Sequence, residues 1–182
     1  MEFVLIIVMA AIYALVHIAN GWVFHLFEIS AHISWIYLPA FLRLFFILVL
    51  GRVNGFIAIF LGGFLLSNQF VEPSFIWFFN SMCSASAPVL ALFLFTRWHQ
   101  RAIELTSLRD LLQLTVVYCL INALLHHFAW AILDPVQLQE PLQVAGMAVG
   151  DFLGCLIGVG LMKAAIERFG LPRGLAQPPS QD

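Results

Sequence analysis

Two residues of opposite charge interrupt apolar stretches of this sequence. Arg43 lies in "YLPAFLRLFFILVLG" (residues 37–51), and Asp151 lies in "GMAVGDFLGCLIG" (residues 146–158). A charge at the middle of a membrane span costs roughly 2.5–3.5 kcal/mol on insertion scales. At about 1.5 Å per helical residue, both side chains lie about 12–14 Å from the same membrane surface. We therefore predict that they form an intramembrane ion pair, completed by other polar groups or water.

Further polar side chains are expected at the same depth, in one half of the membrane. They are His17, Asn20, Asn80, Asn122, His126 and His127. Ionisable residues inside a membrane are functional candidates by default. Three interpretations stay open: a structural hydrogen-bond network, a cavity that opens outward and binds a small molecule or ion, and a proton relay.

A second group, in "HLFEISAH", has spacings that fit a metal site. His25, Glu28 and His32 share a face if the first helix continues that far, and His126 or His127 would add a ligand for zinc or copper. The alternative is an interfacial turn whose side chains anchor at the lipid headgroups. Because the spacing is not HExxH, we predict no metal or other cofactor and keep these three as candidates.

Other chemistry has little support in the sequence. The three cysteines, Cys83, Cys119 and Cys155, lie in apolar segments at spacings that fit neither a zinc site nor a disulfide framework. We see no nucleophile with a base, no phosphate-binding loop and no redox motif, so we do not expect an enzyme. The net charge of −2 argues against nucleic acid as a partner.

The elements that must position these residues are membrane-spanning helices. The chain is 62% hydrophobic and only 10% charged, with a mean hydropathy of +0.97. A span needs about 20 apolar residues to cross about 30 Å of hydrocarbon. Six segments qualify: 3–25, 34–50, 53–70, 74–96, 108–133 and 143–168. We predict an all-α bundle of about six transmembrane helices over residues 1–170, with a tight hairpin at "GRVN", and a short disordered cytoplasmic tail over 171–182.

The basic residues predict the orientation of this bundle. Seven of the eight fall on one side of six spans: Arg52, Arg97, Arg101, Arg109, Lys163, Arg168 and Arg173. The other side carries acidic residues and no Lys or Arg: Glu28, Glu72, Asp134 and Glu140. Basic loops stay in the cytoplasm. Both termini are therefore predicted to be cytoplasmic, in a bacterial inner membrane.

Four glycines recur every four residues in the last segment: Gly146, Gly150, Gly154 and Gly158. On a helix they form one smooth stripe that allows a neighbouring backbone to approach closely. Packing within the chain is the favoured interpretation, and homo-oligomerisation is the alternative.

Two stretches resemble MASE-type bacterial integral membrane sensor domains: "SWIYLPAFLRLFFILVLGRVNGFIAIFLGGFLLSN" and "MAVGDFLGCLIGVGLMK". The matching positions are Trp35, Pro39, Gly51, Gly62 and Asn68, followed by Gly150, Asp151 and Gly154. The resemblance covers about a third of the chain. MASE-type domains usually have more spans and are fused to histidine kinases or diguanylate cyclases, and this chain ends without either.

The resemblance implies a sensor-like or accessory module that relays binding of a small molecule to a separate cytoplasmic partner. The alternative is the substrate-binding subunit of an energy-coupling-factor type vitamin transporter. Those subunits have about this length and six spans, and they dock through small residues on the first span, where this chain has Ala10 and Ala14. The expected partners are the lipid bilayer, a signalling or transport protein, a small-molecule ligand and, through the glycines, a second copy of the chain.

Overall fold

Five helices, all long and apolar enough to cross a membrane, account for most of the residues that the structure describes. The computed structural model describes residues 2–30, 33–66, 74–133, 135 and 142–169. The helices are α1 (Glu2–Val23), α2 (Pro39–Leu65), α3 (Ser74–His99), α4 (Leu108–Leu133) and α5 (Gln143–Phe169). Between α1 and α2 lie a 3-10 turn, η1 (His25–Phe27), and two short antiparallel strands, β1 (Glu28–Ser30) and β2 (Ile33–Ser34).

The predicted number of six helices is corrected to five, because the second and third expected spans form the single helix α2. The break between them is one residue, Gly51, with φ +80° and ψ 171°. Glycine adopts a positive φ without steric cost. Two helical stretches therefore meet directly at Gly51, without the separate connection that was expected at "GRVN".

The two halves of α2 nevertheless fold back on each other at Gly51. A side-chain carbon at Gly55 would lie 2.7 Å from the carbonyl oxygen of Phe46 and 2.9 Å from the Cα of Ile47. In a straight helix, residues nine apart are separated by about 13 Å along the axis. This contact therefore requires a sharp reversal, and it agrees with the tight hairpin expected here.

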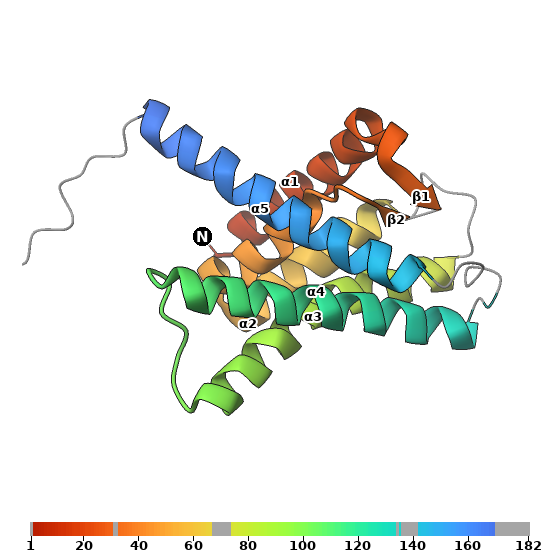
Figure 1. The fold of residues 1–182 in the computed structure, drawn as a ribbon. Helices are drawn as coiled ribbons and strands as arrows, with labels where there is room; N and C mark the ends of the chain where they lie inside the picture. The colour runs from red at the N-terminus through yellow and green to blue at the C-terminus, as the bar shows by residue number, and fades with distance from the viewer. Residues whose placement is uncertain (1, 31–32, 67–73, 134, 136–141, 170–182) are drawn as a thin grey trace, which may run out of the picture.

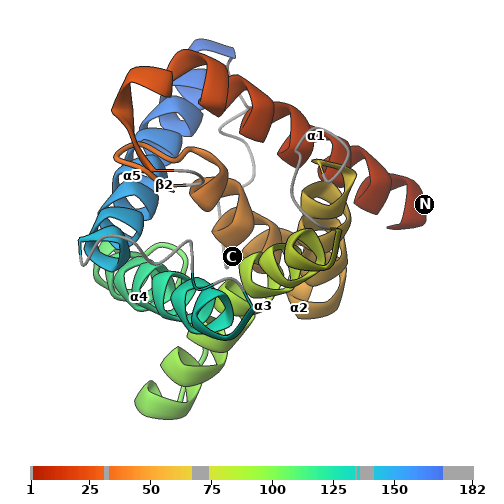
Figure 2. The same cartoon turned by 90° about the vertical axis from the view of Figure 1, so that its right-hand side faces the viewer.

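α2 lies at the centre of the bundle and packs against α1, α3 and α5. In Figure 2 the first half of α2 lies inside a ring formed by the other helices. Figure 1 shows the start of α1, the end of α5 and the α3–α4 connection at the same end of the bundle. The assignment of that end to the cytoplasm stays a prediction.

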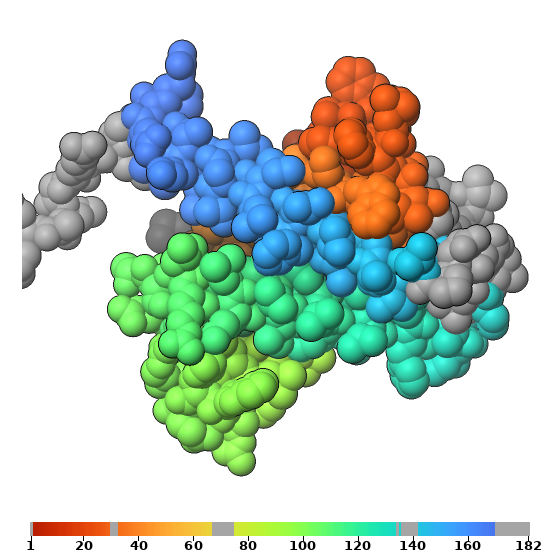
Figure 3. All heavy atoms as spheres, viewed as in Figure 1, coloured from red at the N-terminus to blue at the C-terminus, as the bar shows by residue number. Residues whose placement is uncertain are grey.

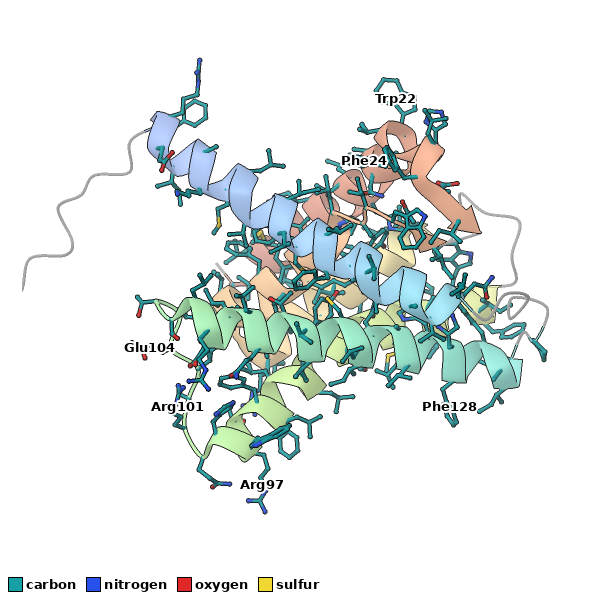
Figure 4. All side chains as sticks on the ribbon, viewed as in Figure 1. Trp22, Phe24, Arg97, Arg101, Glu104 and Phe128 are labelled. Atoms are coloured by element: carbon teal, nitrogen blue, oxygen red, sulfur yellow. The ribbon has the colours of Figure 1, made fainter. Side chains whose placement is uncertain are left out.

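The burial pattern is that of a bundle in lipid. Large apolar side chains such as Phe3, Leu15 and Phe128 are exposed on its outer surface, and the Phe128 side chain points away from the bundle in Figure 4. Polar groups are buried inside, Arg43 and Asp151 among them. Two of the three free cysteines, Cys119 and Cys155, are buried and Cys83 is half-buried. The predicted tail, and also His32, Asn68, Glu72, Asp134, Glu140 and Arg173, fall outside the described residues.

Candidate ligand cavity

A cavity of about 540 Å³ lies among the helices at one end of the bundle. It is lined by seven of the eight predicted polar residues: His17, Asn20, Arg43, Asn80, Asn122, His126 and Asp151. The lining also includes Gly21 and Glu28, which are exposed, so the cavity reaches the surface. Its volume falls within the range of about 300–1,000 Å³ typical of small-molecule sites. The residues that were predicted to lie at one level, from their positions along the helices, therefore line one cavity.

Arg43 is held by two tyrosine hydroxyls. Its Nε donates to Tyr13 Oη at 2.7 Å, and its Nη2 donates to Tyr37 Oη at 3.0 Å. The guanidinium carbon also lies 5.7 Å and 5.0 Å from the centroids of the same two rings. A cation over an aromatic face is favourable when it is shielded from water. Arg43, only 4% exposed, is therefore stabilised by neutral partners.

Tyr37 lies in the segment between β2 and α2 and links Arg43 to α1. Its hydroxyl lies 2.8 Å from His17 Nδ1. Burial raises the pKa of Tyr37 well above its usual range, so the hydroxyl stays protonated. A neutral hydroxyl can accept from Arg43 and donate to His17 at the same time. His17 is thereby placed at the cavity wall through a hydrogen bond that orients its ring.

Asn20 fixes the segment that carries Tyr37. Its Nδ2 donates to the carbonyl of Ile36 at 3.2 Å, and its Oδ1 accepts from the N–H of Leu38 at 2.8 Å. Both polar ends of the amide are therefore used on the backbone. Asn20 lines the cavity, and these bonds give it a positioning role at the start of α2.

Asp151 does not form the predicted ion pair with Arg43. Its Oδ2 accepts a hydrogen bond of 2.6 Å from Asn122 Nδ2 on α4. Among the described residues the ion pairs within 4.0 Å are Arg101–Asp110 and Lys163–Glu167. Equal depth fixes position along the membrane normal but leaves rotation about each helix free, so residues at one level need not touch. Arg43 and Asp151 instead line the same cavity with different partners.

The α3 and α4 side chains of the predicted layer pair with each other. Trp130 Nε1 donates to Asn80 Oδ1 at 2.8 Å. His126 Nδ1 lies 2.9 Å from the carbonyl of Asn122, an acceptor, so Nε2 is free to accept from Ser84 Oγ at 3.4 Å.

His127 is the predicted residue that does not line the cavity. Its Nδ1 bonds the carbonyl of Ala123 at 2.8 Å, and its ring packs 5.1 Å from that of Trp130. Neighbouring helical residues point about 100° apart, so His126 and His127 could not both face the cavity centre.

The glycine stripe of α5 is covered by the chain's own residues, as favoured from the sequence. A side-chain carbon at Gly150 would collide with the carbonyl oxygen of Ser34, and one at Gly154 with that of Tyr37. Gly146 and Gly158 face the side chains of Ile29 and Phe41 in the same way.

This close approach places the Tyr37 segment directly on α5. The N–H of Tyr37 donates to the carbonyl of Gly150 at 3.1 Å. The stripe therefore positions Tyr37, which binds Arg43. Homo-oligomerisation is not needed to explain the four glycines.

The metal candidates do not share a helix face, because α1 ends at Val23 and η1 and β1 follow. His25 Nδ1 contacts the carbonyl of Trp22 at 3.1 Å, and Glu28 is at the cavity mouth. His32 lies outside the described residues. Within the described ranges, no group of three His, Cys, Asp or Glu side chains is arranged to hold a metal.

Sequence reasoning missed the hydroxyl and aromatic groups of the cavity, above all Tyr13 and Tyr37. A signal was present in α1, since Tyr13, His17 and Asn20 are spaced by four and three residues and share a face. The missed lining residues also include Ser81, Ser84, Trp77 and Trp130. No family model, curated protein or solved structure matches the chain.

Proposed function

We propose that this multi-pass helical membrane protein is a sensor-like or accessory module, which binds a small molecule in the cavity and relays the binding to a separate protein. The observation that carries the proposal is the cavity itself, of about 540 Å³, with a buried cation and a buried carboxylate that are not paired with each other. A purely structural network would be expected to neutralise its charges internally, because unpaired buried charges are costly. Charges left facing a cavity suit a ligand.

The route for a relay is α5. Asp151 lines the cavity, whereas residues 159–169 of the same helix are exposed throughout. Figure 3 shows this last part of α5 projecting from the bundle. Its surface carries Lys163, Glu167 and Arg168. A continuous helix could transmit a shift at Asp151 to that end, where an exposed surface is available to a partner.

Several of the residues that carry the resemblance to MASE-type domains bend or closely pack the backbone. Gly51 forms the bend of α2. A side-chain carbon added at Gly62 would lie 2.6 Å from the carbonyl oxygen of Ala10. Gly150 and Gly154 hold the Tyr37 segment. The resemblance thus supports a shared way of packing a polar cavity, which fits a sensory role.

Substrate capture for a transporter is the second candidate, and it is supported by the cavity. Its sequence motif is less favourable, since Ala10 of the Ala10–Ala14 pair is buried against Gly62 inside the bundle. That contact makes Ala10 unavailable to an external coupling subunit.

Purification of the full chain from its native membrane in mild detergent tests these alternatives. Native mass spectrometry of the wild type should show a retained small molecule, and the Arg43→Gln variant should lack it, whereas the exposed-site control Lys163→Gln should retain it. A co-purifying kinase or cyclase supports sensing, and a co-purifying ATPase supports transport. A small molecule retained equally by the wild type and Arg43→Gln would contradict the proposed site.

A further inference from the structure

Several polar atoms on residues that line the cavity make no hydrogen bond to the described part of the chain. Arg43 uses Nε and Nη2, so Nη1 is left over as a donor. Asp151 uses Oδ2, so Oδ1 is left over as an acceptor. Asn122 Oδ1 and Ser81 Oγ are buried without a partner. All four residues line the same cavity.

The two open charged groups have opposite signs. A ligand that carries only a negative charge would gain from Arg43 but be repelled by Asp151, and a purely cationic ligand would meet the reverse. A ligand that carries both charges satisfies both groups and offsets the cost of burying each of them. Residues beside the charges supply apolar contact surface: Ile33, Leu66, Trp77, Trp130 and Met147.

From this arrangement we infer that the cavity binds a zwitterion, a free amino acid or a close relative with an apolar side chain. The inference rests on the proposed ligand-binding function. The carboxylate of the ligand accepts from Arg43 Nη1, and its ammonium group donates to Asp151 Oδ1 and Asn122 Oδ1. The side chain lies against the tryptophans and aliphatic residues of the wall. Glu28 at the mouth adds a second negative group outside the buried pair.

The test is a binding series on the full chain in detergent, by thermal shift and calorimetry, with the twenty common L-amino acids. For the tightest one, two derivatives are compared: its N-acetyl form, which lacks the ammonium, and its amide, which lacks the carboxylate. Each derivative should bind about 10- to 100-fold more weakly, as expected for the loss of a hydrogen bond to a charged group. A derivative that binds as well as the parent overturns the inference.

Two variants connect each ligand charge to its residue. In Arg43→Gln the difference in affinity between acid and amide should shrink, and in Asp151→Asn the difference between amine and N-acetyl form should shrink. Arg97→Gln, at an exposed position in the last turn of α3, should preserve both differences. The derivative series on the wild type decides the matter if either cavity variant fails to fold.

Failure of this inference can be separated from failure of the proposed function. The same assay is run with sugars, dicarboxylates and polyamines. Binding of one of these without any amino acid would refute the zwitterion and leave the ligand-binding function intact. Absence of binding by every compound in the panel would count against both.

Discussion

The protein holds two arginines in opposite ways at opposite ends of the bundle. Arg101, in the α3–α4 connection, contacts both carboxylate oxygens of Asp110, at 2.5 and 2.8 Å, and this hydrogen bonding raises the pKa of Arg101. Arg43, inside the bundle, is bound by Tyr13 and Tyr37. Figure 4 shows Arg101 at the end of the bundle away from Trp22. The more exposed Arg101 is paired with a carboxylate. The buried Arg43 is bound by neutral hydroxyls, so its charge is not neutralised by a partner and is available to the cavity.

The largest effect should come from disturbing the surface that holds Tyr37. In Gly154→Val the new side chain collides with the Tyr37 backbone, which cannot move without breaking the contacts of Asn20. Overpacking of this kind costs about 3 kcal/mol, measured as a loss of melting temperature in detergent. Gly160→Val is the matched control on the same helix, because nothing lies within 4 Å of its added carbon. Equal losses in the two variants would show that the close approach is unimportant.

The two arginines themselves are the next comparison. Arg43→Gln removes the cation shared by two tyrosines and should lower the stability by about 1–3 kcal/mol, since hydrogen bonds to charged groups are stronger than neutral ones. Arg101→Gln should have a smaller effect, because the Arg101 side chain is 48% exposed and the Asp110 carboxylate, itself 3% exposed, keeps its hydrogen bond from the N–H of Glu104. Thermal unfolding of both variants checks the order. A larger loss of stability in Arg101→Gln than in Arg43→Gln would contradict the conclusion that the buried arginine contributes more.

The hydroxyl of Tyr37 allows the contribution of one partner of Arg43 to be measured. Tyr37→Phe removes the acceptor of Arg43 Nη2 and the partner of His17, and it should cost about 1–2 kcal/mol. Tyr118→Phe is the control, because the buried Tyr118 hydroxyl has no hydrogen-bond partner among the described residues and its removal should be neutral or stabilising. Chemical unfolding followed by tryptophan fluorescence measures both. The interpretation of Tyr37 as a link fails if its variant is as stable as Tyr118→Phe.

The smallest effect should be the response to salt. Raising the ionic strength from about 0.05 M to about 0.5 M shortens the screening length several-fold. The stability difference between wild type and Arg101→Gln should decrease, because the Arg101 side chain of that pair is 48% exposed and salt can screen its charge. The difference for Arg43→Gln should stay nearly constant, since Arg43 is only 4% exposed. A parallel decrease in both would show that salt reaches Arg43 as easily as it reaches Arg101.

The grouping of the polar residues at one level of the helices could be predicted from the sequence, and the direction of each side chain could not. Arg43, Asp151 and Asn122 were expected at one level and do share a cavity, because helical rise is constant. Their actual partners depend on rotation about each helix axis, which a span with apolar residues on all sides does not reveal. Tyr13 and Tyr37 were missed for the same reason. In a membrane sequence, tyrosine commonly indicates the interface, and here it binds a cation.

The number of helices shows the same limit at the level of the backbone. The polar residues of "GRVN" predicted a break, and the structure places it at the single residue Gly51, where the chain reverses direction. A hydrophobicity pattern detects where a chain leaves the apolar phase. It does not report how many residues the chain uses to turn before the next helical stretch begins.

The bend at Gly51 also has a consequence for biosynthesis. Pro39–Leu50 would measure only about 18 Å along its axis and 52–65 about 21 Å, both less than the roughly 30 Å of a bilayer's hydrocarbon. Neither half is long enough to be integrated by the translocon as a separate span. The two halves are therefore expected to enter the membrane together as a hairpin, and the first half takes its place inside the ring (Figure 2) once the other helices have formed. α2 is therefore expected to be the last helix to reach its final position, although it precedes α3, α4 and α5 in the chain.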